Sequence, residues 1–157
     1  MAPSTPIPIE VLECLSKGGV AWNAQDYVTA KQHANEALEL AQRQKHVHGE
    51  LGALHLLANI AFNQCEDKAS RELHDRVKTR SLEVGFWEGA ASSLTNLALI
   101  DIVDSNLSAA RDKYQQAIGL YETVSNVEMV EIVRAILSKE KIEAVLDGIP
   151  RIPAAQK

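Results

Sequence analysis

The stretch Gly52–Ala61, which reads GALHLLANIA, returns further along the chain as Gly89–Ala98, which reads GAASSLTNLA. A second helical segment follows each copy, with Ala69 or Ala110 near its start, and a weaker copy precedes both at Gly18–Ala21. The pattern therefore comes round about every forty residues, and periods of roughly 20 to 50 residues are typical of solenoids. Each unit of a solenoid buries its apolar face only by stacking on a neighbour. This pattern favours a binding scaffold over an enzyme.

The composition fits one domain of closely packed helices. The chain has 157 residues, of which 46% are hydrophobic and only 4% aromatic. Ala and Leu are abundant, and they suit helices whose backbones approach closely. The net charge is −5 and no basic run is present, which argues against nucleic acid as a partner because that binding needs a Lys/Arg face. No stretch is apolar enough to cross a membrane.

The cysteines and the N-terminus suggest where the protein resides. Cys14 and Cys65 lie far apart and lack the spacing of metal ligands, so we expect two free thiols in a reducing compartment. The first residues do not combine a basic region with an apolar one, as a signal peptide would. We therefore expect a cytoplasmic protein.

Hydrophobic periodicity and capping residues predict seven helices. Asp26 is the expected N-cap of the second helix, and Gly85 suits a left-handed C-terminal cap. Ser125 and Glu128 read as a capping box at the start of the last helix. The expected helices span about residues 8–23, 26–44, 48–64, 67–83, 87–103, 107–123 and 126–146.

These helices divide the chain into an N-terminus, one domain and a tail. We expect residues 1–7 to be disordered and residues 148–157 to form a flexible tail. The domain, residues 8–147, would hold repeats at about 8–44, 47–83 and 87–124, followed by a capping helix at 126–147. The short connections predict antiparallel neighbours, and the division of the last helix into apolar and charged faces suits the end of a stack.

Two of the three repeats share a pattern of small and apolar residues. The third repeat carries Asn96, Leu97, Ala98, Ala110, Tyr114 and Ala117. The first repeat carries Gly18, Ala30, Ala34 and Ala37. With these residues the repeats resemble the tetratricopeptide repeat (TPR) family, of the long-repeat type, over roughly residues 10–124. The resemblance implies an all-α fold, a right-handed α-solenoid of three antiparallel helix pairs plus a C-terminal capping helix.

The second repeat departs from this pattern. It reaches Ala69 about one helical turn early, and Arg76 stands where a second Ala is expected. Either the turn between its two helices is shorter, or Leu73 takes the Ala position. We favour the shorter turn because it keeps the distances between repeats more even.

The resemblance also implies a binding site on the concave face, which the first helix of each pair lines in TPR proteins. If Asn59 and Asn96 are equivalent, the residues on that face are His55, Asn59 and Phe62, then Ser92, Asn96 and Leu99, with Trp22 from the first repeat. An Asn at such a position often hydrogen-bonds the backbone of an extended peptide in this family, and an amide suits that task because it both donates and accepts. The alternative is that each Asn bonds a neighbouring helix or solvent.

One TPR class is disfavoured. Carboxylate-clamp TPRs hold a peptide C-terminus with Lys and Arg, whereas residues 52–64 and 89–103 contain neither. The groove is therefore expected to be neutral to apolar, which suits a helix or an extended apolar segment.

The sequence shows no catalytic or metal-binding motif. The five histidines lack the spacing of a structural zinc site, and there is no nucleophile elbow, phosphate-binding Gly loop or zinc-protease signature. We expect no metal, no cofactor and no enzymatic activity.

The leading hypothesis is a non-catalytic TPR-like adaptor that binds a protein or peptide segment in its concave groove. A self-associating or complex-assembly module, with this chain as a homo-oligomer, is the second hypothesis. A small-molecule or catalytic pocket around His55, Cys65 and Trp22 is the third.

Overall fold

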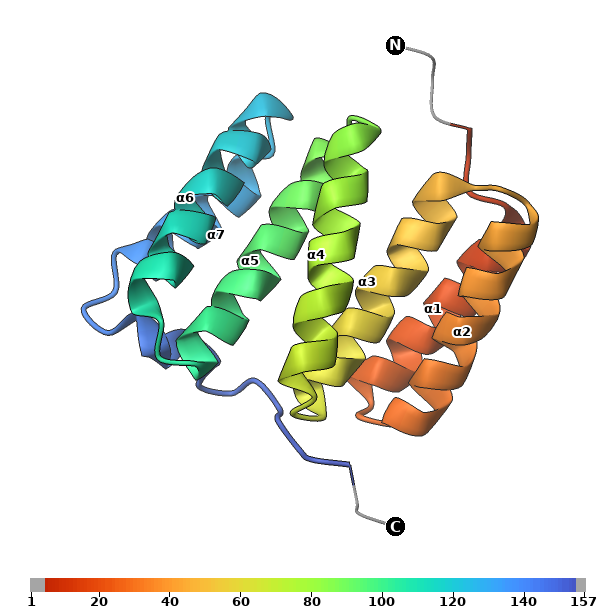
Figure 1. The fold of residues 1–157 in the computed structure, drawn as a ribbon, viewed down its shortest axis with the longest axis horizontal. Coiled ribbons are helices and arrows are strands. Elements are labelled where there is room, and N and C mark those ends of the chain that lie inside the picture. Colours follow the sequence, from red (N-terminus) through yellow and green to blue (C-terminus); the bar gives the residue numbers. More distant parts are fainter. Residues whose placement is uncertain (1–4, 155–157) are drawn as a thin grey trace.

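The computed structural model describes residues 5–154, and within them the chain forms seven α-helices and one short 3-10 helix (Figure 1). The α-helices are α1 (Ile9–Asn23), α2 (Tyr27–Arg43), α3 (Val47–Asn63), α4 (Asp67–Glu83), α5 (Trp87–Val103), α6 (Leu107–Thr123) and α7 (Val127–Leu137). The 3-10 helix, η1, spans Ile142–Leu146. This part of the chain contains no strand, and each α-helix packs against the next one. The predicted all-α solenoid is confirmed.

Six connections of the same length join these seven helices. The middle residue of each connection has a positive φ, and these residues recur at intervals of twenty: Gln25, Lys45, Cys65, Gly85, Ser105 and Ser125. The next residue donates its backbone N–H back to the end of the preceding helix, as Asp26 does to the Ala21 carbonyl at 2.9 Å. This arrangement satisfies carbonyls that a helix end leaves unpaired. Identical turns therefore give every helix pair the same length of forty residues, and the left-handed position predicted for Gly85 is confirmed.

The second repeat obeys the same spacing, so the shorter turn expected for it is wrong. Ser70 occupies the position that Ala30 and Ala110 hold in the other repeats, because each donates its N–H to the N-cap residue of its helix. The Ser70 side chain is fully buried, and its hydroxyl donates to the Ala58 carbonyl at 2.9 Å. A serine fits here because that bond pairs its only polar group inside the helix contact.

The end of the domain differs from the expectation in two ways. The start of α7 is capped by Asn126, whose side chain accepts from the Met129 N–H at 3.1 Å, whereas Ser125 is the left-handed turn residue and forms no capping box. The predicted capping helix to residue 147 is also wrong, since α7 ends at Leu137. Arg111 of α6 donates to the Leu137 carbonyl at 3.2 Å, which satisfies the helix end. The chain then turns and buries Ile142 through η1.

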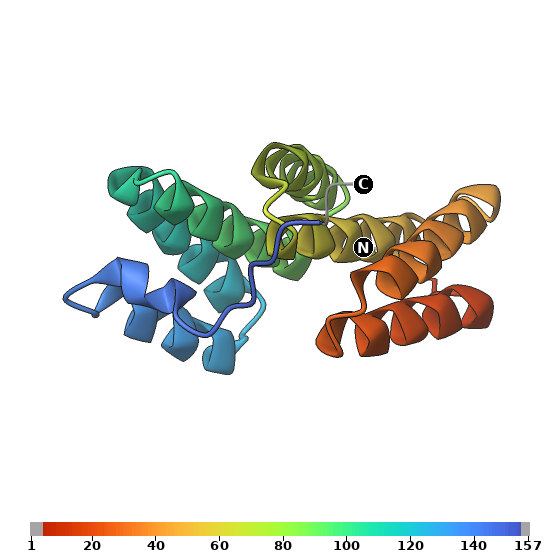
Figure 2. The same cartoon turned by 90° about the horizontal axis from the view of Figure 1, so that it is seen from below.

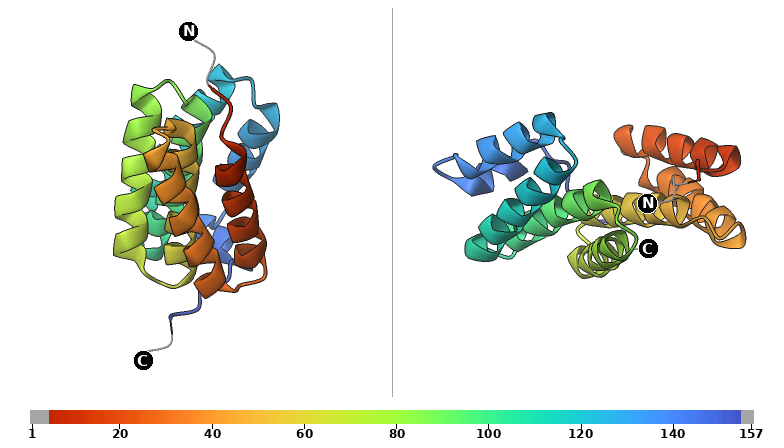
Figure 3. Two further views of the ribbon diagram at one scale, coloured as in Figure 1. Left: turned by 90° about the vertical axis from the view of Figure 1, so that its right-hand side faces the viewer. Right: turned by 90° about the horizontal axis from the view of Figure 1, so that it is seen from above.

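The helices form a curved stack with one concave face. Seen along the helix axes, α1 and α7 project to one side while α4 lies on the other (Figures 2 and 3). Helices α3 and α5 lie between them and form the floor of the concave face. Closely spaced alanines let α1 and α2 approach, and those on α2 are fully buried: Ala30, Ala34, Ala37 and Ala41.

Both ends of the described chain return to this stack. Near the N-terminus, the Thr5 carbonyl lies 2.9 Å from Nε2 of His46, and Ile7 packs beside Val11. Near the C-terminus, residues 148–154 run from η1 across the lower end of α3 (Figure 2). The segment expected to be a flexible tail is thus hydrogen-bonded to the domain. The remaining parts of the predicted disordered N-terminus and tail, residues 1–4 and 155–157, lie outside the described residues.

Candidate functional site

The floor of the concave face carries a polar row across the seam between α3 and α5. Nδ2 of Asn96 donates to Oδ1 of Asn59 at 3.3 Å, and one helical turn or so away Ser92 Oγ lies 3.5 Å from Nε2 of His55. All four side chains are half-buried. The structure therefore brings these four predicted site residues together, and it does so by pairing each Asn with the neighbouring helix, which was the alternative considered for them.

Asn59 and Asn96 lie side by side, but they do not hold equivalent positions. Counted from the identical turns, Asn59 corresponds to Leu99 and Asn96 to Leu56. The assumed equivalence is wrong by about one helical turn. The pairing arises because residues of neighbouring helices that face each other are displaced along the axis, and a displacement of three residues keeps a side chain on the same helix face.

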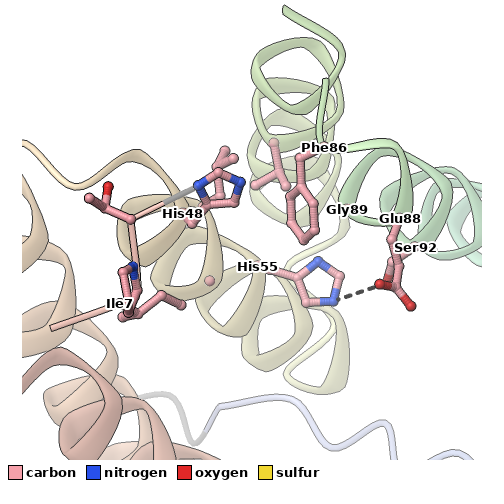
Figure 4. Close-up of a pocket in the computed structure, with 12 residues that line it drawn as sticks. Ile7, His48, His55, Phe86, Glu88, Gly89 and Ser92 are labelled. Atoms are coloured by element: carbon pink, nitrogen blue, oxygen red, sulfur yellow. Dashed lines mark hydrogen bonds between the residues drawn. The ribbon is translucent and has the colours of Figure 1, made fainter. Parts of the chain in front are cut away.

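A cavity of about 500 Å³ lies at the upper end of the polar row, between α3, α4, α5 and the N-terminal segment (Figure 4). Its apolar wall includes Leu51, Val77 and Phe86, and its polar groups include His55 and Ser92. The full lining is Thr5, Pro6, Ile7, His48, Leu51, Gly52, His55, Val77, Phe86, Glu88, Gly89 and Ser92. Such a mixture of apolar wall and few polar groups is typical of a site that takes an apolar group and orients it.

Two imidazoles beside this cavity are held neutral. His55 and His74 lie with their ring centroids 5.2 Å apart, in an edge-to-face arrangement. Burial lowers the pKa of His55, while burial and then the neighbouring His55 lower the pKa of His74 to about 3. Neither ring nitrogen of His74 has a hydrogen-bond partner among the described residues. Near pH 7 both of these imidazoles are therefore neutral.

A second cavity, of about 310 Å³, lies at the lower end of the row. It brings together the remaining predicted site residues, Trp22, Phe62 and Leu99, beside Asn59 and Asn96. The other lining residues are Asn63, Gly148, Ile149 and Pro150. The C-terminal segment of the chain thus forms one wall of the cavity that the predicted site residues surround.

Asn63, the last residue of α3, holds that segment in place. Its Nδ2 donates to the Pro150 carbonyl at 2.6 Å, and its own backbone carbonyl accepts from the Ile152 N–H at 2.6 Å. The remaining acceptor, Oδ1, accepts from Trp22 Nε1 at 2.6 Å. Asn63 is almost fully buried. Its side-chain amide both donates and accepts a hydrogen bond, and the bond that it donates goes to the segment's backbone, as in recognition of an extended peptide.

The side chain between these two backbone contacts is also bound. Nη2 of Arg151 donates to both carboxylate oxygens of Asp67, at 2.9 and 2.8 Å, and its guanidinium lies 4.2 Å from the centre of the Phe62 ring. Charge-assisted hydrogen bonds are stronger than neutral ones, and the cation–π contact adds a further attraction. Sequence reasoning missed Asn63, Asp67 and Arg151, because no local pattern distinguishes them from other polar residues at helix ends.

Other chemistry is limited in residues 5–154. No three His, Cys, Asp or Glu side chains in this range lie close enough together to hold a metal ion. Cys14 is buried and Cys65 exposed, and both are free. No helix of the described chain has the length and apolar character needed to cross a bilayer.

In comparisons with known proteins, no family model and no curated protein matches this chain.

Proposed function

We propose that this chain is a non-catalytic, TPR-like adaptor that binds a segment of another protein along its concave face. The observation that carries the proposal is that an extended segment, residues 149–152, already lies at this face with its backbone hydrogen-bonded to Asn63. A surface that holds one extended segment through main-chain bonds and side-chain pockets has the chemistry to hold another.

The rest of the face supports the same function. The Asn59–Asn96 pair uses one donor and one acceptor, so each amide keeps hydrogen-bonding capacity for a ligand backbone. The cavities at the two ends of the polar row are lined mainly by apolar groups and would take apolar side chains. Residues 52–64 and 89–103 contain no Lys or Arg, so the expected ligand is an internal segment and not an acidic C-terminus.

The test compares binding by three full-length proteins. The groove variant is Asn59→Ala/Asn96→Ala, and the matched control is Gln115→Ala/Gln116→Ala, which removes two exposed amides from α6. All three must show the same helicity by circular dichroism. Partners are captured from source lysate and identified by mass spectrometry, and the bound segment is then synthesised and titrated by calorimetry.

We expect the segment to bind the groove variant at least about tenfold more weakly than the other two proteins, which corresponds to about 1.4 kcal/mol for the lost amide contacts. Equal affinity for all three proteins would place the interface elsewhere and contradict the proposal.

Self-association is the second candidate, and one observation favours it. Three aliphatic side chains of α1 remain largely exposed within the described chain: Ile9 is 69% exposed, Leu12 46% and Val20 68%. Exposed apolar patches of this kind often mark contacts between proteins. A mass that rises with concentration in sedimentation velocity, and that Leu12→Glu returns to the monomer value, would support this candidate; a strict monomer would contradict it.

A further inference from the structure

The C-terminal segment overlaps the groove residues on which the proposed function depends. Gly148, Ile149 and Pro150 share a cavity with Asn59 and Phe62. A partner that reaches the lower half of the polar row would therefore meet the chain's own residues first.

The overlap is brought about by a turn at Gly148. Its φ of +81° is a backbone conformation that other residues rarely adopt, and it redirects the chain from η1 toward α3. The Ile149 N–H donates to the Leu146 carbonyl at 3.1 Å and closes this turn. Pro150 follows. Because proline favours extended backbone and has no N–H that needs a partner, it suits an extended segment that crosses the end of a helix.

Recognition of the segment separates into a general part and a specific part. The bonds from Asn63 to Pro150 and Ile152 involve the segment's backbone and are available to any extended chain. The specific part is Arg151, whose Nη2 donates to both carboxylate oxygens of Asp67 and whose guanidinium lies over the Phe62 ring. The side chain of Ile149 packs against the cluster that contains Phe62, so this end of the groove recognises an aliphatic residue followed two positions later by an arginine.

The segment is held by few contacts. Pro150 and Ile152 are exposed, with 54% of Ile152 accessible, and only Ile149 and Arg151 are partly buried. Among residues 5–154, buried Nη1 of Arg151 has no hydrogen-bond partner, which is a cost to the bound state. The segment stays bound mainly because it is covalently linked to the domain, which gives it a high local concentration at the groove.

We propose that residues 148–152 are a reversible, built-in occupant of the concave groove, and that the external partner displaces them with an extended segment that carries an aliphatic residue two positions before an arginine. The proposal rests on the proposed adaptor function and adds the partner chemistry and an autoinhibitory contact. The residues that would bind either segment are Asn63, Asp67 and Phe62.

The experiment uses a fluorescently labelled peptide with the sequence of residues 147–154, DGIPRIPA, titrated into full-length proteins by anisotropy. The proteins are wild type, Arg151→Ala, in which the segment has lost its specific contact, and the matched control Lys141→Ala, which removes an exposed cation just before η1. A second peptide has its Arg replaced by Ala.

We expect the DGIPRIPA peptide to bind Arg151→Ala at least about tenfold more tightly than wild type or Lys141→Ala, because its own segment no longer competes. The peptide without Arg should bind none of them. Equal affinity of the DGIPRIPA peptide for wild type and Arg151→Ala, or equal affinity of both peptides for Arg151→Ala, would overturn the proposal.

A measurement on wild-type protein covers the case in which Arg151→Ala misfolds. The Ile152 amide, which is bonded to Asn63, should be protected from hydrogen exchange, and a saturating excess of peptide should remove that protection. Protection that persists at saturation would overturn the proposal.

The two proposals fail separately. In one case DGIPRIPA binds no variant, but Asn59→Ala/Asn96→Ala still loses a partner. This result supports the adaptor function and contradicts the built-in occupant. In the other case the peptide binds Arg151→Ala, but no partner depends on Asn59 and Asn96. This result supports a segment-binding site at the lower end of the groove and contradicts an adaptor function along the whole face.

Discussion

Arg151 and Asp67 are separated by 84 residues, yet the guanidinium of one meets both carboxylate oxygens of the other at 2.8 and 2.9 Å. The pair joins the C-terminal segment to the first turn of α4, and its side chains are only 18% and 28% exposed. Because water screens it less than a surface ion pair, it is expected to contribute more than such pairs usually do.

A double-mutant cycle on this pair should therefore give a measurable coupling. Asp67→Ala and Arg151→Ala should each lower the free energy of unfolding, and the double variant should lose less than the sum by about 1 kcal/mol. Urea unfolding followed by circular dichroism measures this difference. Strict additivity of the two single changes would show that the contact does not form in solution.

The pKa of His74 predicts a loss of stability in mild acid. The pKa is about 3 in the folded protein and 6.5 for an unperturbed histidine, so the unfolded chain takes up the proton first as the pH falls. Stability is thus fully present above about pH 6.5 and decreases toward pH 3, by up to about 1.4 kcal/mol for each pH unit.

His74→Leu removes this titration while keeping the site filled. The difference in unfolding free energy between His74→Leu and wild type should shift in favour of the variant as the pH falls from 7 to 4.5, measured by urea unfolding at each pH. Parallel pH profiles for the two proteins would mean that the imidazole of His74 is not desolvated.

Neighbouring glycines on α1 should respond in opposite ways to alanine. A Cβ at Gly18 would lie 2.8 Å from Leu56 Cδ2 and 3.4 Å from the Ala30 carbonyl oxygen, whereas a Cβ at Gly19 would meet nothing within 4 Å. Gly19→Ala should stabilise the protein by about 0.8 kcal/mol through helix propensity. Gly18→Ala should destabilise it by about 1 kcal/mol through overpacking.

Thermal and urea unfolding of the two variants check this prediction, and each serves as the other's control. The same sign for both changes would contradict the close packing of Gly18 against Leu56 of α3 and Ala30 of α2.

The left-handed turn residues offer a second matched pair. Gly85 has φ of 72° and Lys45 has φ of 52° at corresponding positions of different turns. Since a side chain in this region costs about 1 kcal/mol, Gly85→Ala should destabilise the protein by about that amount. Lys45→Gly should gain about 0.5 kcal/mol, because the relief of strain is partly offset by greater freedom of the unfolded chain.

Urea midpoints at constant m-value measure both effects. If Lys45→Gly were destabilising by as much as Gly85→Ala, the strain of the non-glycine turns would not be relieved by glycine, and the shared turn geometry would be in doubt.

Local chemistry predicted most of the helices and little of the site. The first six helices begin and end within about two residues of their expected bounds, because periodicity and turn residues act over a few positions. The last helix was predicted too long because nothing in the sequence around Leu137 shows that Arg111 of α6 satisfies its end. Similarly, Ser125 and Asn126 are both good N-caps, and only the repeated turn geometry decides between them.

The sequence by itself determined the approximate period and the first six helices, because both depend on residue types and spacings along the chain. Only the tertiary structure decided that Asn59 faces Asn96 from a different register, and that Asn63 and Asp67 bind Pro150, Arg151 and Ile152. These contacts depend on how far each helix is displaced along its neighbour and on the direction that the chain takes after the turn at Gly148. Such displacements arise from packing between distant segments, which no local pattern records.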